Sequence, residues 1–204
     1  VKYEVRSPKV SQVKELFDRV VKVANGAALM TETTMEFEIT MAFSDYIANA
    51  PLAEIANEAF LEVGPPQWSD EDVQLAKAFM ATFNQSTKDA MVESITEEYG
   101  VAQAMEILER PLDSQVHPFD PKNKKYASGS TDVGDVAYAV PTINFNVATA
   151  FMGNVGHTWQ MTGQSGSNLA DKGLVIAAKV MALSALKTMD RPEIVDQAKL
   201  FTQR

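Results

Sequence analysis

The sequence contains no cysteine and only two histidines, His117 and His157. The absence of thiols excludes a disulfide framework, a thiolate zinc site and a cysteine nucleophile. Any metal ion would have to be held by His, Asp, Glu or backbone oxygen. The apolar runs are short and broken by polar residues, so the sequence predicts no membrane-spanning helix.

Positive charge is also scarce, since 18 Lys and Arg residues stand against 27 Asp and Glu residues, a formal net charge of -9. The basic residues are scattered, so we expect no nucleic-acid-binding face. The chain has 204 residues, of which 46% are hydrophobic, as in an ordinary globular protein. The sequence starts inside a strand-like pattern without a signal peptide. We therefore expect a cytoplasmic location and a fragment of a longer protein.

The first 48 residues predict a strand, a helix and a second strand. Residues 1–6 and 33–43 alternate between apolar and polar side chains, which is typical of half-buried strands. Between them, residues 10–24 carry apolar side chains at helical spacing, and Asn25-Gly26 marks the expected end of that helix. We expect a domain boundary after residue 48, with 1–48 as one domain and 49–204 as the other.

The rest of the chain predicts helices followed by a mixed region. Helices are expected over 51–63, 70–83, 87–99, 101–108 and 168–188, with a last one beginning at Pro192. Ser69 and Asp72 are typical of a capping box. β-Branched and aromatic residues over 136–140 and 143–151 favour strands. The helix 168–188 is apolar nearly all round, so we expect most of it to be buried.

A run of small residues and hydroxyls, residues 129–135, is the first segment that could carry chemistry. It reads Gly129-Ser130-Thr131-Asp132-Val133-Gly134-Asp135. Beside a strand, such residues let backbone N–H groups approach a bound anion. The alternative is a turn that is capped by Ser and Asp side chains.

His157 is the second candidate. It lies between Gly156 and Thr158, and the nearby glycines favour a tight turn that aims the imidazole into a cleft. The alternative is a histidine that serves as a structural hydrogen-bond donor. His157 cannot complete a catalytic zinc site alone, since such sites typically use three protein ligands. His117 lies in a proline-rich loop, and we interpret it as structural.

Several ordered motifs resemble a known family. They are Val5-Arg6-Ser7-Pro8, Gly26-Ala27-Ala28-Leu29-Met30-Thr31, the run from Gly129 to Val136, Val140-Pro141-Thr142, Gly156-His157-Thr158-Trp159-Gln160, Lys172-Gly173 and Ala177-Ala178-Lys179. With these motifs the chain resembles the C-terminal part of amidohydrolases of the p-aminobenzoyl-glutamate hydrolase type. That family lies in the zinc-dependent aminoacylase, carboxypeptidase and desuccinylase metallopeptidase superfamily.

The resemblance implies an α/β fold. Residues 1–48 would be half of a ferredoxin-like α+β lid, which also dimerises, and residues 49–204 the C-terminal portion of a zinc-peptidase-like catalytic domain. It implies hydrolysis of an N-acyl or peptide-like amide, such as p-aminobenzoyl-glutamate, with zinc, manganese or cobalt as the divalent metal. It also implies a homo-oligomer.

The resemblance also assigns site residues. His157 would be a metal ligand, and Asn49, Gly129, Ser130, Thr131 and Asp132 would contact the substrate or shape the metal pocket. The family's other metal ligands and its general-base glutamate lie in motifs that this sequence lacks, so we expect the chain alone to be inactive. One alternative is a non-catalytic binding or assembly module from a split or truncated gene. Another is an unrelated anion-binding α/β domain in which His157 is incidental.

Overall fold

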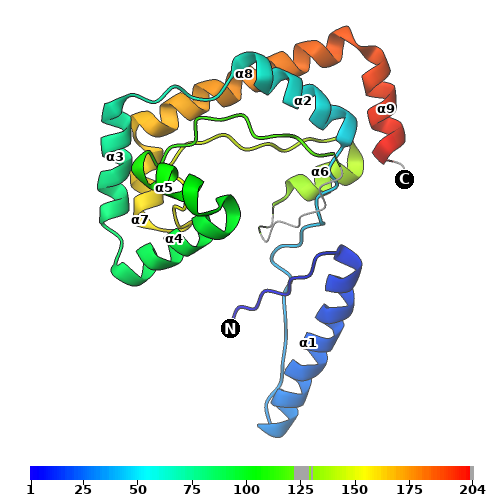
Figure 1. Ribbon diagram of the computed structural model, residues 1–204. Coiled ribbons are helices and arrows are strands. Elements are labelled where there is room, and N and C mark those ends of the chain that lie inside the picture. The colour runs from blue at the N-terminus through cyan, green and yellow to red at the C-terminus, as the bar shows by residue number, and fades with distance from the viewer. Residues whose placement is uncertain (122–128, 130, 203–204) are drawn as a thin grey trace. The chain divides into compact units, whose positions relative to one another are not determined.

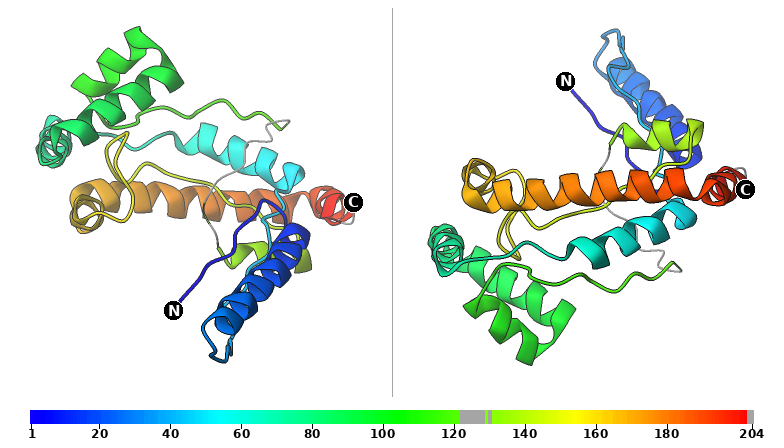
Figure 2. Two further views of the ribbon diagram at one scale, coloured as in Figure 1. Left: turned by 90° about the horizontal axis from the view of Figure 1, so that it is seen from below. Right: turned by 90° about the horizontal axis from the view of Figure 1, so that it is seen from above.

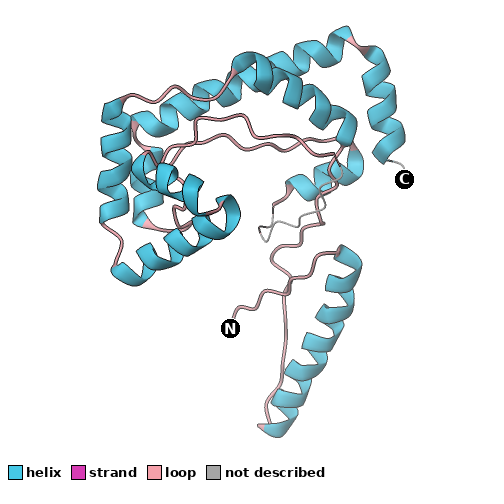
Figure 3. Ribbon diagram, viewed as in Figure 1, coloured by secondary structure: helices cyan, strands magenta, loops and turns pink. Residues whose placement is uncertain are grey.

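The computed structural model describes residues 1–121, 129 and 131–202. Within these residues, the regular secondary structure consists of helices (Figures 1 and 3). They are α1 (Val10–Met30), α2 (Ala50–Val63), α3 (Asp70–Ala81), α4 (Gln85–Tyr99), α5 (Val101–Glu109), α6 (Val133–Ala139), α7 (Trp159–Ser165), α8 (Asn168–Asp190) and α9 (Pro192–Thr202).

The expected α/β fold is wrong, because the described residues contain helices and loops but no strand or sheet (Figure 3). Residues 1–6, 33–43 and 143–151, each expected to be a strand, run as loops and turns. An alternating pattern indicates which residues would share a face of a strand. A strand also needs an adjacent extended segment whose backbone N–H and C=O groups pair with its own. These segments find no such neighbour in the described part of the chain, so neither the ferredoxin-like lid half nor a sheet of the catalytic portion is formed.

The strand expected over 136–140 is wrong for a different reason, since most of it belongs to α6. Gly134 and Ala137 lie one helical turn apart and are both buried. Val136 and Tyr138 in the helix, and Val140 just after it, are about half exposed. The weak strand propensity of such partly exposed residues does not decide the structure here.

The chain divides into two compact units, each built from separated segments. Unit 1 contains Val1–Ala53, Asp120–Asn144 and Glu193–Arg204, and unit 2 contains Glu54–Phe119 and Phe145–Pro192. The division expected at residue 48 concerns the domains of a larger enzyme and stays a prediction.

In unit 1, α1 packs loosely. No residue of α1 is buried, and the loop of residues 33–43 runs back along it (Figure 1). The main aromatic contact is between Phe17 and Phe37, whose ring centroids lie 5.5 Å apart. Phe37, Ile39 and Met41 are each more than half exposed. This part of the unit therefore leaves much of its apolar surface in water.

Unit 2 contains the main hydrophobic core. Its buried members are Val73, Ala76, Phe83, Met91, Ile95, Ala104, Ile107, Leu112, Phe151 and Leu169. Helices α4 and α5 lie side by side in both views of Figure 2. Phe83 and Phe151 meet edge to face at 6.0 Å between centroids. The core thus joins helices α3–α5 to Phe151, in the loop before α7, and to Leu169 in α8.

Helix α8 is less buried than its composition predicts. Leu169, Gly173 and Val180 are its buried residues, while Leu174, Met181 and Met189 are more than 60% exposed. Gly173 is buried because the loop before α7 crosses it, and a Cβ at this position would lie 2.3 Å from the carbonyl oxygen of Ala148. Only one stripe of α8 is therefore covered. In the described part of the chain, no helix combines the length and the apolar character needed to cross a membrane.

Candidate functional site

The segment before α6 forms a hydrogen-bonded turn. The backbone N–H of Val133 donates to Thr131 Oγ1 at 3.3 Å, and that of Gly134 donates to the Thr131 carbonyl at 3.3 Å. Gly129 and Asp132 are exposed, and nothing lies within 4 Å of a Cβ built on Gly129. Ser130 lies outside the described residues. The turn is thus held by Thr131, while Asp132 makes no capping hydrogen bond with its side chain. A cap by Ser130 and anion binding by the segment both stay predictions.

Helix α6 contacts residues 44–46, which lie about 90 residues earlier in the sequence. The backbone N–H of Ser44 donates to Asp135 Oδ1 at 3.1 Å, and the Tyr138 hydroxyl donates to Asp45 Oδ1 at 3.1 Å. Gly134 lies so close to Ser44 that a Cβ would come within 2.0 Å of the Ser44 carbonyl oxygen. Three contacts therefore fix this segment on the first turns of α6.

Asp45 also caps helix α1 from 35 residues away in the sequence. Asp45 Oδ1 accepts from the backbone N–H of Val10 at 3.0 Å, and Oδ2 accepts from Lys9 Nζ at 2.9 Å. Lys9, the residue at the cap position, makes no capping hydrogen bond with its own side chain. Burial alone would raise the pKa of Asp45, but the bonds from Lys9, Val10 and Tyr138 outweigh burial and lower that pKa to about 2. Asp45 therefore stays charged where it joins the two helices.

Tyr46 also connects this segment to the loop after α6, within unit 1. Its hydroxyl donates to the Thr142 carbonyl at 3.2 Å and accepts from the backbone N–H of Asn144 at 2.9 Å. Burial raises the pKa of Tyr46 above its usual value of 10.0. One side chain thus satisfies two backbone groups of the loop that follows α6.

Asn49 is 2% exposed and lies at the start of α2. Its Nδ2 donates to the Ala198 carbonyl at 2.9 Å and to Thr202 Oγ1 at 3.2 Å, and its Oδ1 accepts from the backbone N–H of Leu52 at 3.2 Å. Asn49 therefore caps α2 and ties it to α9. A contact between Asn49 and a substrate stays a prediction.

His157 lies in the turn before α7, in unit 2, and is exposed. Its backbone has a φ of 58°, in the left-handed region that non-glycine residues rarely adopt. The turn is fixed by Thr158, whose Oγ1 donates to the Val155 carbonyl at 2.8 Å and accepts from the backbone N–H of Met161 at 3.3 Å. The tight turn predicted from the glycines is thus present, and it presents the imidazole to solvent. The ligand role of His157 stays a prediction.

Across the described ranges, no three His, Asp or Glu side chains are grouped as a metal site requires. His117 pairs with a carboxylate instead, since its Nε2 lies 2.6 Å from Asp113 Oδ2. Asp113 Oδ1 also accepts from the backbone N–H of Gln115 at 3.0 Å. This pairing supports the structural interpretation of His117.

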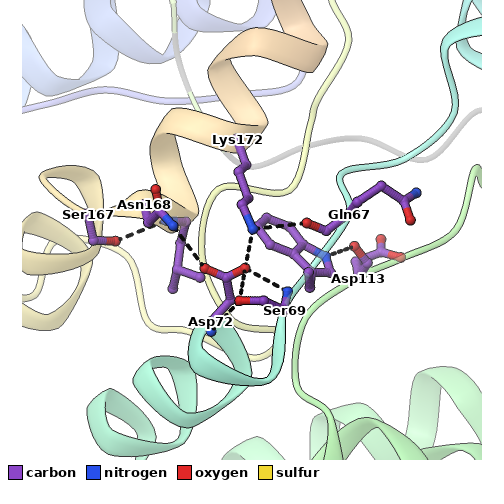
Figure 4. A network of polar contacts seen from close by, with 9 residues as sticks. Gln67, Ser69, Asp72, Asp113, Ser167, Asn168 and Lys172 are labelled. Atoms are coloured by element: carbon purple, nitrogen blue, oxygen red, sulfur yellow. Dashed lines mark hydrogen bonds and ion pairs between the residues drawn. The ribbon is translucent and has the colours of Figure 1, made fainter.

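The sequence analysis missed a partly buried ion pair between α3 and α8, in which the carboxylate is buried and the lysine is about one third exposed. Asp72, whose side chain is 2% exposed, pairs with Lys172 Nζ, which also donates to the Gln67 carbonyl at 3.1 Å (Figure 4). The predicted capping box is present, since the backbone N–H of Ser69 donates to Asp72 Oδ2 at 2.8 Å. Burial would raise the pKa of Asp72, but Lys172 and Ser69 lower it overall. The capping box was visible in the sequence, whereas its partner 100 residues later was not.

The chain is similar to part of a hydrolase. The similar protein is the subunit designated B in the p-aminobenzoyl-glutamate hydrolase of Escherichia coli (strain K12), and the two are 34% identical over 189 residues, which are 91% of this chain and 39% of that protein. The chain thus spans about two fifths of the length of the curated relative it matches. No family model and no solved structure matches the chain. The resemblance predicted from the motifs is confirmed by this comparison.

Proposed function

We propose that this chain is part of a metal-dependent amidohydrolase that cleaves p-aminobenzoyl-glutamate or a related N-acyl amide. The observation that carries the proposal is the 34% identity, which extends over 91% of the chain. Because this chain matches only 39% of the relative, a large part of a complete active site would have to come from sequence that this chain does not contain.

The proposed metal is zinc, with manganese or cobalt as alternatives, and His157 would supply one ligand. The described residues do not fit a complete site, since they hold no cluster of three ligating side chains. When bound, such a metal lowers the pKa of water and polarises a carbonyl. The contribution of this chain is limited to holding one imidazole on a turn that Thr158 fixes.

The proposed substrate contacts are Asn49, Gly129, Ser130, Thr131 and Asp132. The Asp132 carboxylate would repel a glutamate carboxylate, so Asp132 would help to shape the pocket, and backbone N–H and hydroxyl groups of the segment would receive the substrate carboxylate. The open space beside Gly129 supports such an approach.

Cytoplasmic location stays a prediction.

A non-catalytic assembly role is the second candidate. It is favoured by the exposed side chains of Phe37, Ile39 and Met41, which form an apolar row beside α1. Through this row, copies of the chain would associate into a homo-oligomer. In this role His157 has no metal to bind.

Two assays test these proposals. The isolated chain, incubated with zinc, manganese or cobalt, should not hydrolyse p-aminobenzoyl-glutamate, because no described cluster can hold and activate a metal-bound water. Turnover that survives repurification would contradict this expectation.

The second assay uses a chimera in which this chain replaces the matching 189 residues of the Escherichia coli protein. In the chimera, His157→Ala should remove one metal equivalent and nearly all turnover, while His117→Ala should change both little. Full metal content and normal rates in the His157→Ala chimera would show that His157 is not a ligand.

A further inference from the structure

Two helices of unit 1 are joined through one carboxylate. Asp45 accepts from the first turn of α1 through the Val10 N–H and from α6 through the Tyr138 hydroxyl, both at Oδ1. Lys9 bonds the other oxygen. A single side chain therefore accepts from α6, from the first residue of α1 and from the residue before it, and the two helices lie more than 100 residues apart in the sequence.

The segment around Asp45 cannot move on α6 without breaking further contacts. Ser44 donates to Asp135, and its carbonyl lies against Gly134 without room for a methyl group. Helix α6 in turn continues directly from Thr131, whose carbonyl and hydroxyl bond the N–H groups of Gly134 and Val133. A continuous chain of contacts thus runs from Thr131 through α6 to the start of α1.

We propose that Asp45 is a positioning residue that couples α6, and with it Thr131 and Asp132, to helix α1. A displacement of α6 changes the cap of α1 because both depend on the same carboxylate. If Thr131 and Asp132 bind substrate, as the proposed function holds, α1 responds to that binding without touching the ligand. Only this last consequence rests on the proposed function.

Hydrogen exchange of the full chain, followed by mass spectrometry, tests the coupling. Tyr138→Phe removes one hydroxyl from α6, and Asp45→Asn removes the shared charge. Tyr3→Phe is the matched control, since Tyr3 is 76% exposed and is not one of the residues that bond Asp45. Far-UV circular dichroism confirms that each variant keeps its helices.

We expect Tyr138→Phe to speed exchange about five-fold in residues 10–14, which Tyr138 does not bond, since a weakened cap frays the first turn. Asp45→Asn should speed exchange in both residues 10–14 and residues 133–139, and Tyr3→Phe in neither. Faster exchange in α6 alone for Tyr138→Phe, with Asp45→Asn affecting α1 alone, would show two independent contacts and overturn the proposal.

A second arm adds p-aminobenzoyl-glutamate to the wild-type chain. Slower exchange in both residues 129–136 and residues 10–14 supports the coupling, and the effect on 10–14 should disappear in Asp45→Asn. Protection of 129–136 without any change at 10–14 overturns it. If the ligand protects neither region while the variants behave as expected, the coupling stands and the substrate role of 129–132 fails.

Discussion

Gly134 and Ser44 touch through their backbones, and a Cβ on Gly134 would lie 2.0 Å from the Ser44 carbonyl oxygen. That distance is far below any contact that real side chains make, and the atom it meets is backbone rather than a flexible chain end. The glycine in the motif 129–135 is therefore needed for packing, since it lets residues 44–46 lie directly on α6.

Gly134→Ala should destabilise the chain by about 1–3 kcal/mol, because the added methyl group forces the segment off the helix. The gain in helix propensity from Gly to Ala, up to about 1 kcal/mol, is smaller than this cost. Gly129→Ala is the control, since open space surrounds that residue, and its stability should be equal or slightly higher. Urea unfolding followed by circular dichroism measures both. Equal stability of the two variants would contradict the close contact.

The pH dependence of stability should report on Asp45. Its pKa is about 2 in the folded chain and 3.8 as the ordinary value, so the folded state favours the charged form. The stabilisation is complete above about pH 4 and is lost as the pH falls through 2, with a total of about 2 kcal/mol. The free energy of unfolding of Asp45→Asn should therefore approach that of the wild type between pH 5 and pH 2. A constant difference over this range would show that the carboxylate is not held as described.

Lys172→Met should cost about 3 kcal/mol, because it leaves the buried Asp72 carboxylate without its cation. Adding Asp72→Asn to Lys172→Met should restore part of that loss. The exposed pair Arg110–Asp70, at 3.0 Å, is the control, and Arg110→Met should cost less than about 1 kcal/mol. Thermal unfolding of the four proteins measures these differences. Similar losses for Lys172→Met and Arg110→Met would argue against a buried pair.

Helix ends were the best predicted part of the fold, because their signals are local. The Ser69–Asp72 box, the end of α4 at Tyr99 and the start of α9 at Pro192 all lie where the sequence predicts them. Helix α1 continues past the expected stop at Asn25-Gly26 to Met30. A single glycine costs a helix only about 1 kcal/mol, so neighbouring alanine and leucine residues can carry it through.

Alternation predicted strands that the described residues do not form, because strand pairing depends on residues elsewhere in the chain. Residues 33–43 alternate strictly, yet the described chain supplies no ladder for them. The burial of α8 was overestimated for the same reason, since composition shows that Leu174 and Met181 are apolar but not whether anything covers them. At the candidate site, the motif 129–135 could be found in the sequence. Its contacts with residues 44–46 could not, because they are tertiary contacts that no local pattern reveals.

The division of the chain has a consequence for producing its parts separately. The backbone passes between the two units four times, after residues 53, 119, 144 and 192, and both termini belong to unit 1. No single cut releases either unit as a continuous polypeptide. To isolate unit 2, residues Glu54–Phe119 and Phe145–Pro192 would have to be spliced by a new linker. Unit 1 could be obtained only by joining three separate pieces of sequence.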